Sequence, residues 1–226
     1  LYGKVGKDGH ATTVHNAIAI LYNRMGDPAQ ARHYYEAALK AQTAAGLKRE
    51  QLVTVHNLGR TLENLGDWNA AEHAFRQCLA LGVELGYVRG RAYALRGLAG
   101  VQLARGRADE ALTLLDQAAA LQQQTPDARL HAQIQLQRGK ALHAAQRLAQ
   151  AAAALRDALA IFDEAESPAE RLRVHESLGA VLADQSDWRG AWEQQRAACE
   201  RIEQLLRAQL VARVAALKVD VHAAAR

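Results

Sequence analysis

Apolar and small side chains return along this chain with a fixed period of 40. Because residues three, four and seven apart share one face of a helix, the apolar positions inside each unit of the period predict two amphipathic helices joined by a tight turn. A shift of 40 aligns three sets of small residues and one set of large apolar ones: Ala31, Ala71, Ala111, Ala151 and Ala191; Ala38, Cys78, Ala118, Ala158 and Ala198; Ala19, Gly59, Ala99, Gly139 and Gly179; Tyr35, Phe75, Leu115 and Leu155.

The small residues indicate where helices cross closely, and the polar residues between helices indicate turns and caps. Two helices approach each other most closely where side chains are small, so Gly59 is expected to be a packing residue. Asp27, Asp67 and Asp187 are expected to cap the second helix of their units. Thr125-Pro126 is expected to start a helix in the same way.

One unit of the repeat resembles a known family. Asn57-Leu58-Gly59, Leu62, Leu65-Gly66-Asp67, Ala71, Phe75 and Cys78 follow the pattern of the tetratricopeptide repeat, with a period of 40 in place of 34. This resemblance implies an all-α fold, a right-handed α-solenoid of stacked antiparallel helix pairs that ends in a long C-terminal helix. It also implies a protein-interaction module.

The period divides the chain into five full repeats, near residues 11–50, 51–90, 91–130, 131–167 and 168–205. Residues 1–8 are expected to be the tail of an earlier repeat, because Gly6 aligns with Gly46 and Gly86. Residues 206–226 are expected to form a C-terminal helix that either caps the solenoid or forms a coiled coil. The predicted oligomerisation seam is Leu206, Leu210, Val214, Leu217 and Val221.

The composition agrees with close-packed helices. Half of the residues are apolar but only 5% are aromatic, and Ala is abundant. The formal charge of +4 is spread along the chain, which is weak support for nucleic-acid binding. The two cysteines lie far apart and do not indicate a disulfide framework, so we expect a cytoplasmic protein. No signal peptide or long apolar run is present. Cys78 and Cys199 are both expected to occupy buried positions.

The sequence lacks the motifs of an enzyme. The glycines do not form a phosphate-binding loop, and no two histidines have the spacing of a metal site. We therefore expect no catalytic residues, no metal and no cofactor.

The remaining candidates lie on the first helix of each pair, on the face turned away from the second helix. We expect this concave face to be polar and mildly basic, and an extended segment, in the first instance an acidic one, to bind there. The candidate ligand-binding residues are Asn16, Asn23, Arg24, His56, Arg60, Asn64, Tyr93, Arg96, Lys140 and His143.

Three hypotheses about function follow. The first is a peptide- or protein-binding module that forms the sensory or scaffolding region of a larger bacterial signalling protein. The second is a self-assembly scaffold that forms a homodimer through its C-terminal helix. The third is a nucleic-acid-binding regulator, suggested by the Arg-Gly-Arg triplets at Arg89–Arg91 and Arg105–Arg107. No membrane partner is expected.

Overall fold

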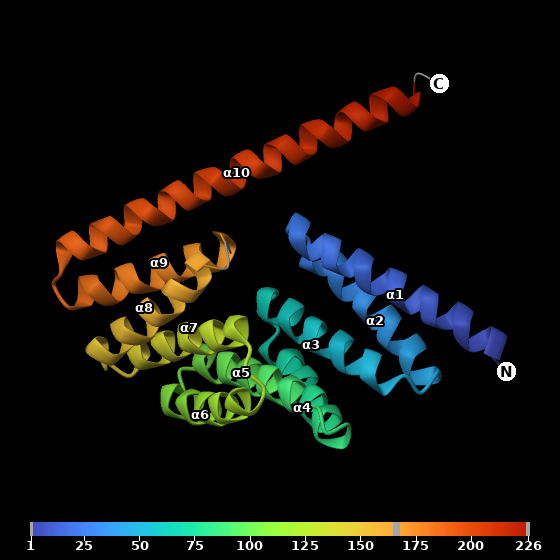
Figure 1. Ribbon diagram of the computed structural model, residues 1–226, viewed down its shortest axis with the longest axis horizontal. Helices are drawn as coiled ribbons and strands as arrows, with labels where there is room; N and C mark the ends of the chain where they lie inside the picture. The colour runs from blue at the N-terminus through green and yellow to red at the C-terminus, as the bar shows by residue number, and fades with distance from the viewer. Residues whose placement is uncertain (1, 165–167, 225–226) are drawn as a thin grey trace. The chain divides into compact units, whose positions relative to one another are not determined.

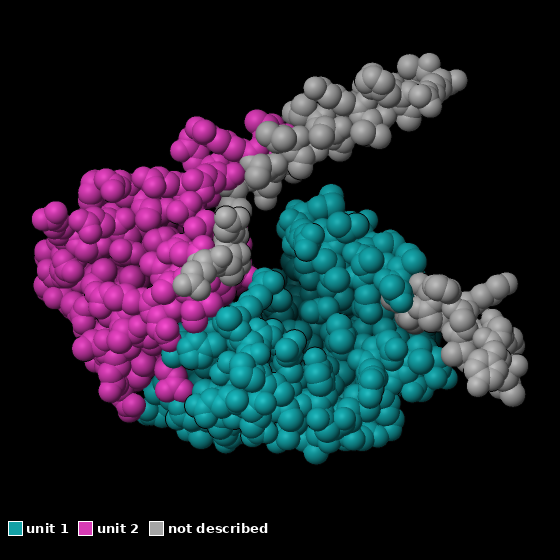
Figure 2. All heavy atoms as spheres, in the orientation of Figure 1, with its two compact units in different colours: residues 1–137 teal, residues 138–226 magenta. Residues whose placement is uncertain are grey.

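The computed structural model describes the backbone of residues 2–164 and 168–224, and the side chains of residues 13–163, 168–204, 206–207 and 210. The chain forms two compact units, residues 1–137 (unit 1) and residues 138–226 (unit 2), each of which is described by itself (Figure 2).

Every regular element in the described ranges is an α-helix (Figure 1). The expected all-α stack of antiparallel helix pairs is therefore confirmed. The helices are α1 (Tyr2–Met25), α2 (Pro28–Ala44), α3 (Lys48–Asn64), α4 (Trp68–Glu84), α5 (Val88–Ala104), α6 (Ala108–Gln124), α7 (Ala128–Ala144), α8 (Leu148–Glu164), α9 (Pro168–Asp184) and α10 (Trp188–Ala224).

Helix α1 differs from the expectation at the start of the chain. It runs without interruption from Tyr2 to Met25, so the turn expected at Gly6 is not present. Gly6 lies on a helix here, whereas Gly46 and Gly86, with which it aligns, lie in turns with positive φ. The proposed tail of an earlier repeat at residues 1–8 stays a prediction.

The turns between helices recur along the chain at half the period of the sequence repeat. From Pro28 to Trp188, each of the helices α3 to α10 begins half a repeat period after the one before it. The residue two positions before each start is a glycine with positive φ in the first five turns, Gly26, Gly46, Gly66, Gly86 and Gly106. Glycine adopts this left-handed conformation without a steric penalty. Gln146 (φ 59°) and Ser186 (φ 62°) adopt it as non-glycine residues.

Aspartates cap the helix starts as expected. The carboxylates of Asp27, Asp67 and Asp187 accept hydrogen bonds from backbone N–H groups three residues later, which satisfies donors at the N-terminus of each helix. The prediction for Thr125-Pro126 was wrong. Helix α7 begins at Ala128, and Asp127, directly before it, caps it by accepting from the N–H of Leu130 at 3.0 Å.

Unit 1 is built around a buried aromatic ring. Phe75 of α4 is 0% exposed and lies against two glycines of neighbouring helices. A Cβ atom at Gly59 would lie 2.7 Å from Phe75 Cε1, and one at Gly97 would lie 2.5 Å from the same atom. These two positions have no room for a side chain, which confirms Gly59 as a packing residue.

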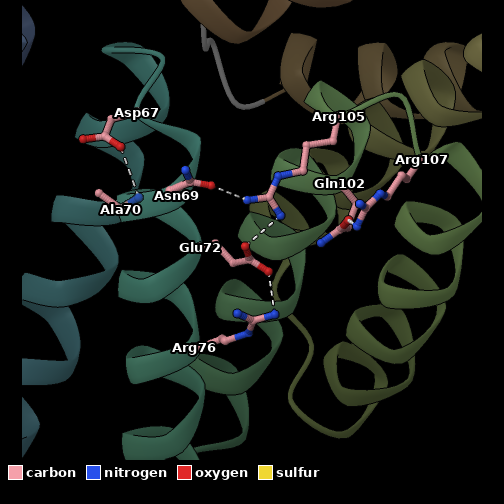
Figure 3. A network of polar contacts seen from close by, with 8 residues as sticks. All are labelled: Asp67, Asn69, Ala70, Glu72, Arg76, Gln102, Arg105 and Arg107. Atoms are coloured by element: carbon pink, nitrogen blue, oxygen red, sulfur yellow. Dashed lines mark hydrogen bonds and ion pairs between the residues drawn. The ribbon is translucent and has the colours of Figure 1, made fainter.

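Polar contacts join each helix pair of unit 1 to the next. The most extensive group joins α4 to the end of α5 (Figure 3). Glu72 is only 8% exposed, and its two carboxylate oxygens accept from Arg105 Nη1 at 2.7 Å and from Arg76 Nη2 at 2.5 Å. Arg105 also donates to Asn69 Oδ1 at 2.8 Å. The buried carboxylate is thus compensated on both sides, and it fixes α4 relative to α5.

Unit 2 contains the end of α7 together with α8, α9 and α10. Leu155 of α8 fills the space beside Gly139, where a Cβ would approach Leu155 Cγ to 2.5 Å. Helix α10 has 37 residues, whereas α2 to α9 have 17 each, so it passes the expected boundary at residue 206 without a break. Of the predicted seam, Leu206 and Leu210 are exposed. Val214, Leu217 and Val221 lie outside the residues whose side chains are described.

The two cysteines differ from each other. Cys78 is buried and free, as expected. Cys199 is exposed, so the expectation that both are buried was wrong. The small-residue position of the fifth repeat is Ala198, which is 1% exposed. Cys199 lies one residue further along α10, about 100° around the helix, and therefore on a different face.

Candidate functional site

The candidate site lies on the odd-numbered helices of unit 1, which are the first helices of each pair. Asparagines on α1 bond directly to threonines on α3. Asn16 Nδ2 donates to Thr54 Oγ1 at 2.8 Å, and Asn23 Nδ2 donates to Thr61 Oγ1 at 2.9 Å. Helix α3 in turn packs against α5 (Figure 1). These helices therefore form a continuous face.

A cavity of about 290 Å³ opens on this face between α3, α5 and α7. Its apolar part comes from Leu52, Val53 and Cys78, and its backbone part from Gly90. The polar groups that line it are His56 and Arg60 from α3, Tyr93 from α5, Arg129 and Gln133 from α7, and Tyr87 from the turn before α5. An apolar pocket with a few convergent polar groups is the usual form of a binding site.

The histidine in this cavity is neutral over the physiological pH range. Burial lowers the pKa of His56 from 6.5 to about 3, and the charges of Arg96 and Arg60 add to this effect. The His56 ring meets Tyr93 edge to face, with ring centroids 5.2 Å apart. Its Nδ1 atom is buried and has no hydrogen-bond partner among the described residues. The positive charge of the cavity therefore comes from its arginines.

Arg60 is the residue best placed to meet an anion. Its side chain is exposed, and it makes no hydrogen bond or ion pair with the residues whose side chains are described. Tyr93 remains a neutral phenol, because burial raises its pKa and Asp127 raises it further. Arg60 and Tyr93 line the same cavity, and a guanidinium group and a phenol O–H are both hydrogen-bond donors to a carboxylate.

A second cavity of about 470 Å³ continues from the first. The two share Leu52, Val53 and Tyr87. The second is lined in addition by Leu85, Gly86 and Arg49, the last of which is exposed at the start of α3. Together the two cavities provide an apolar floor with cationic groups at Arg49 and Arg60.

The structure brings together only part of the predicted site. His56, Arg60 and Tyr93 line one cavity. The side chains of Asn16 and Asn23, on α1, donate hydrogen bonds to threonines of α3. Arg96 is 7% exposed and lies within the helix stack. The ligand-binding role of all these residues stays a prediction.

The other predicted residues lie away from this cavity. Arg24 and Asn64 are exposed near the ends of α1 and α3. Lys140 and His143 belong to unit 2, where His143 Nε2 lies 2.7 Å from Asp184 Oδ2.

Sequence reasoning missed four polar lining residues. Arg49, Tyr87 and Arg129 were not predicted, because they lie at the start of a helix or in the preceding turn. Gln133, which lies further along α7, was not predicted either. A signal for three of them was present. Arg49, Arg89 and Arg129 follow one another at the repeat period, so a basic position recurs at the start of the odd-numbered helices. Gln133 aligns with Tyr93 in the same way.

The described part of the chain contains neither a candidate metal site nor a candidate membrane span. No group of three or more His, Cys, Asp and Glu side chains lies close enough there to hold a metal ion. None of the described helices is long and apolar enough to span a membrane.

Comparison with known proteins gives the family. The family model described as Tetratricopeptide repeat matches residues 10–82 and 90–164, well over half of the chain. The chain belongs to the tetratricopeptide repeat family, which is a protein-interaction fold. No curated protein sequence matches the chain.

Solved structures of low sequence identity share the fold. A thermophilic tetratricopeptide repeat protein of Thermus thermophilus, TTC0263, is 21% identical with a TM-score of 0.65 over 92% of this chain and 100% of its own. A Rap protein in complex with Competence and Sporulation Factor is 15% identical with a TM-score of 0.79. The match covers 86% of this chain but only 55% of that Rap protein. The apo form of RapI is 14% identical with a TM-score of 0.68, over 89% of this chain and 74% of its own.

Proposed function

We propose that this chain binds an extended protein segment bearing carboxylates on the odd-numbered helices of unit 1, and that it acts by binding and not by catalysis. The observation that carries this proposal is the cavity between α3, α5 and α7. There Arg60, which has no partner among the described side chains, and the neutral phenol of Tyr93 lie beside an apolar floor.

The carboxylate would be held by Arg60. A guanidinium group forms two parallel hydrogen bonds with a carboxylate, which are about twice as strong as neutral ones. Because His56 is neutral, its ring supplies packing surface without adding a second charge that would have to be compensated. Arg129 lies in the same lining and adds positive potential.

The second cavity would receive an apolar side chain next to the carboxylate. Leu52, Val53 and Leu85 line it, and Tyr87 lines both cavities. Successive side chains of an extended segment point in opposite directions, so alternate residues would enter the cavities. The preferred segment therefore carries an acidic residue and an apolar residue two positions apart.

The wider role that we propose is the sensory or scaffolding region of a larger bacterial signalling protein in the cytoplasm. Two observations support it. A Rap protein with the same fold was solved with Competence and Sporulation Factor bound, and Cys78 and Cys199 are free thiols. Nucleic acid is a weaker candidate, because Arg89 and Arg105 of the basic triplets form ion pairs with Asp127 and Glu72.

The proposal is tested by titrating the full chain into a fluorescein-labelled pool of short peptides that carry Leu two positions from Asp or Glu, followed by fluorescence anisotropy. A second pool with Asn and Gln in place of the acids is the ligand control. Arg60→Glu is expected to weaken binding of the acidic pool at least about tenfold, because a hydrogen bond to a charged group contributes about 1.5–3 kcal/mol.

The matched control is Lys40→Glu, which makes the same charge change on an exposed position of α2. It is expected to leave binding almost unchanged. Equal binding of the two pools, or equal losses in the two variants, would show that the cavity does not recognise carboxylates.

A further inference from the structure

Helix α10 exposes an apolar stripe that the peptide site does not use. Two tryptophans, Trp188 and Trp192, are 68% and 60% exposed, and Leu206 and Leu210 are 59% and 63% exposed. Exposed cysteine Cys199 lies between them. Large apolar side chains that are gathered on one exposed face mark an interaction surface more often than isolated ones do.

These five residues share one line along the helix. Relative to Cys199 at position i, the tryptophans occupy positions i−11 and i−7 and the leucines positions i+7 and i+11. A step of seven is close to two turns and a step of eleven close to three, so all four fall within about 20° of Cys199 around the axis. Between Trp188 and Leu210 the stripe is about 33 Å long at 1.5 Å per residue.

The stripe is distinct from the face of α10 that packs on α9. On that other face Ala198 is 1% exposed, and Gln194 Oε1 accepts a hydrogen bond from His175 Nδ1 at 2.8 Å. The stripe therefore remains uncovered although α10 is already docked within unit 2.

A further helix pair of the solenoid does not fit this face well. In the four preceding repeats, the even-numbered helix carries Tyr35, Phe75, Leu115 or Leu155 at one position, each at most 1% exposed. The fifth repeat has Gln195 at this position, and Gln195 is exposed. The large apolar residue that a following helix pair would cover is thus missing.

We infer that α10 pairs with α10 of a second copy of this chain in an antiparallel arrangement, with the two-fold axis passing beside Cys199. The argument is the symmetry of the stripe. Antiparallel pairing about Cys199 places Trp188 opposite Leu210 of the second copy and Trp192 opposite its Leu206. A two-fold interface must be self-complementary in this way.

The charges next to the stripe permit this pairing. Residues 189–207 contain four Arg and three Glu, so two copies meet without a large excess of like charge. Three arginine–glutamate pairs already form along the helix, at Arg189–Glu193, Arg196–Glu200 and Arg207–Glu203. Ile202, 41% exposed, extends the apolar surface at one edge. This inference is independent of the proposed peptide site.

The experiment combines light scattering with oxidation of the full chain. We expect light scattering to show a dimer. We also expect diamide to link two chains by a disulfide between their Cys199 thiols. In this step the two thiols lose two protons and two electrons, which diamide takes up. Cys78 is 0% exposed, so Cys78→Ser should still form the link and Cys199→Ser should not. Trp192→Glu with Leu206→Glu should give a monomer, whereas Val83→Glu, on the exposed surface of α4, should remain a dimer.

A second set of variants fixes the orientation. In a Cys199→Ser background, chains with Trp188→Cys mixed with chains with Leu210→Cys should form the disulfide between unlike chains. A parallel pair would instead link Trp188→Cys chains to each other. A monomer in the unmodified chain, a dimer that survives Trp192→Glu with Leu206→Glu, or the parallel pattern of links would each overturn the inference.

Discussion

Replacing glycine by alanine is expected to change the free energy of unfolding in opposite directions at two equivalent positions of the repeat. Gly59 and Gly179 are separated by three repeat lengths, and both lie within helices. At Gly59 a new Cβ would lie 2.7–3.0 Å from three ring atoms of Phe75. At Gly179 the nearest atom is Gln194 Cβ at 3.4 Å, an ordinary van der Waals distance.

The magnitude follows from two opposing terms. Alanine in a helix is favoured over glycine by about 0.5–1 kcal/mol. Overpacking of a full core costs about 1–3 kcal/mol, and Phe75 has no solvent-facing side to move toward because it is 0% exposed. We therefore expect Gly59→Ala to lower the free energy of unfolding by roughly 0.5–2 kcal/mol, taking the difference of the two terms. We expect Gly179→Ala to raise it by about 0.5–1 kcal/mol.

The assay is urea unfolding followed by circular dichroism, with Phe75→Leu as a third variant. The double variant Gly59→Ala with Phe75→Leu should lose less stability than the sum of the two single changes, because the smaller side chain makes room for the new methyl group. Equal responses at Gly59 and Gly179, or strict additivity in the cycle, would refute the packing argument.

Three further changes probe the turns, the buried carboxylate and the histidine. Gln146→Gly should raise the urea midpoint by an amount corresponding to about 1 kcal/mol, because a left-handed conformation costs a non-glycine residue about 1–2 kcal/mol; an unchanged or lower midpoint would contradict the turn assignment. Arg105→Met should cost about 1–2 kcal/mol by removing one partner of the buried carboxylate of Glu72, whereas Arg107→Met should stay within about 0.5 kcal/mol in the same assay. His56 takes up a proton below pH 6.5 in the unfolded chain, but only near a pKa of about 3 in the folded chain. The contribution of His56 to the free energy of unfolding therefore falls with decreasing pH through this window, by up to about 1.4 kcal/mol per pH unit. His56→Phe should flatten the pH dependence of stability between about pH 4.5 and 6.5, and an unchanged slope would show that the histidine is accessible to protons.

The helical repeat could be predicted from the sequence because it depends on side-chain volume at regular intervals. Ala71, Phe75 and Gly59 were assigned to the core from spacing alone, and all three are buried. The sequence analysis did not detect that the turns recur at half the repeat period. The turn glycines align at this shorter spacing only when the two helices of a pair are treated as equivalent, whereas the other repeat positions align at the full period. Pro126 interrupts this glycine pattern as well.

The site was harder to predict than the fold. Periodicity shows which face of a helix points away from its partner, but not how closely the next helix approaches. Asn16 and Asn23 were therefore assigned to the ligand face, and each bonds to a threonine of α3. The cavity that contains His56 also depends on Tyr87 and Arg129, which lie far apart in sequence and near helix starts, where the periodic signal is weakest.

The most direct test of the proposed binding role is hydrogen exchange of the full chain, measured by mass spectrometry with and without the acidic peptide pool. Protection that is concentrated at the start of α3 and the first half of α5, and lost in Arg60→Glu but retained in Lys40→Glu, is the predicted result. Protection confined to the even-numbered helices or to unit 2, or the same protection with the uncharged pool, would contradict it.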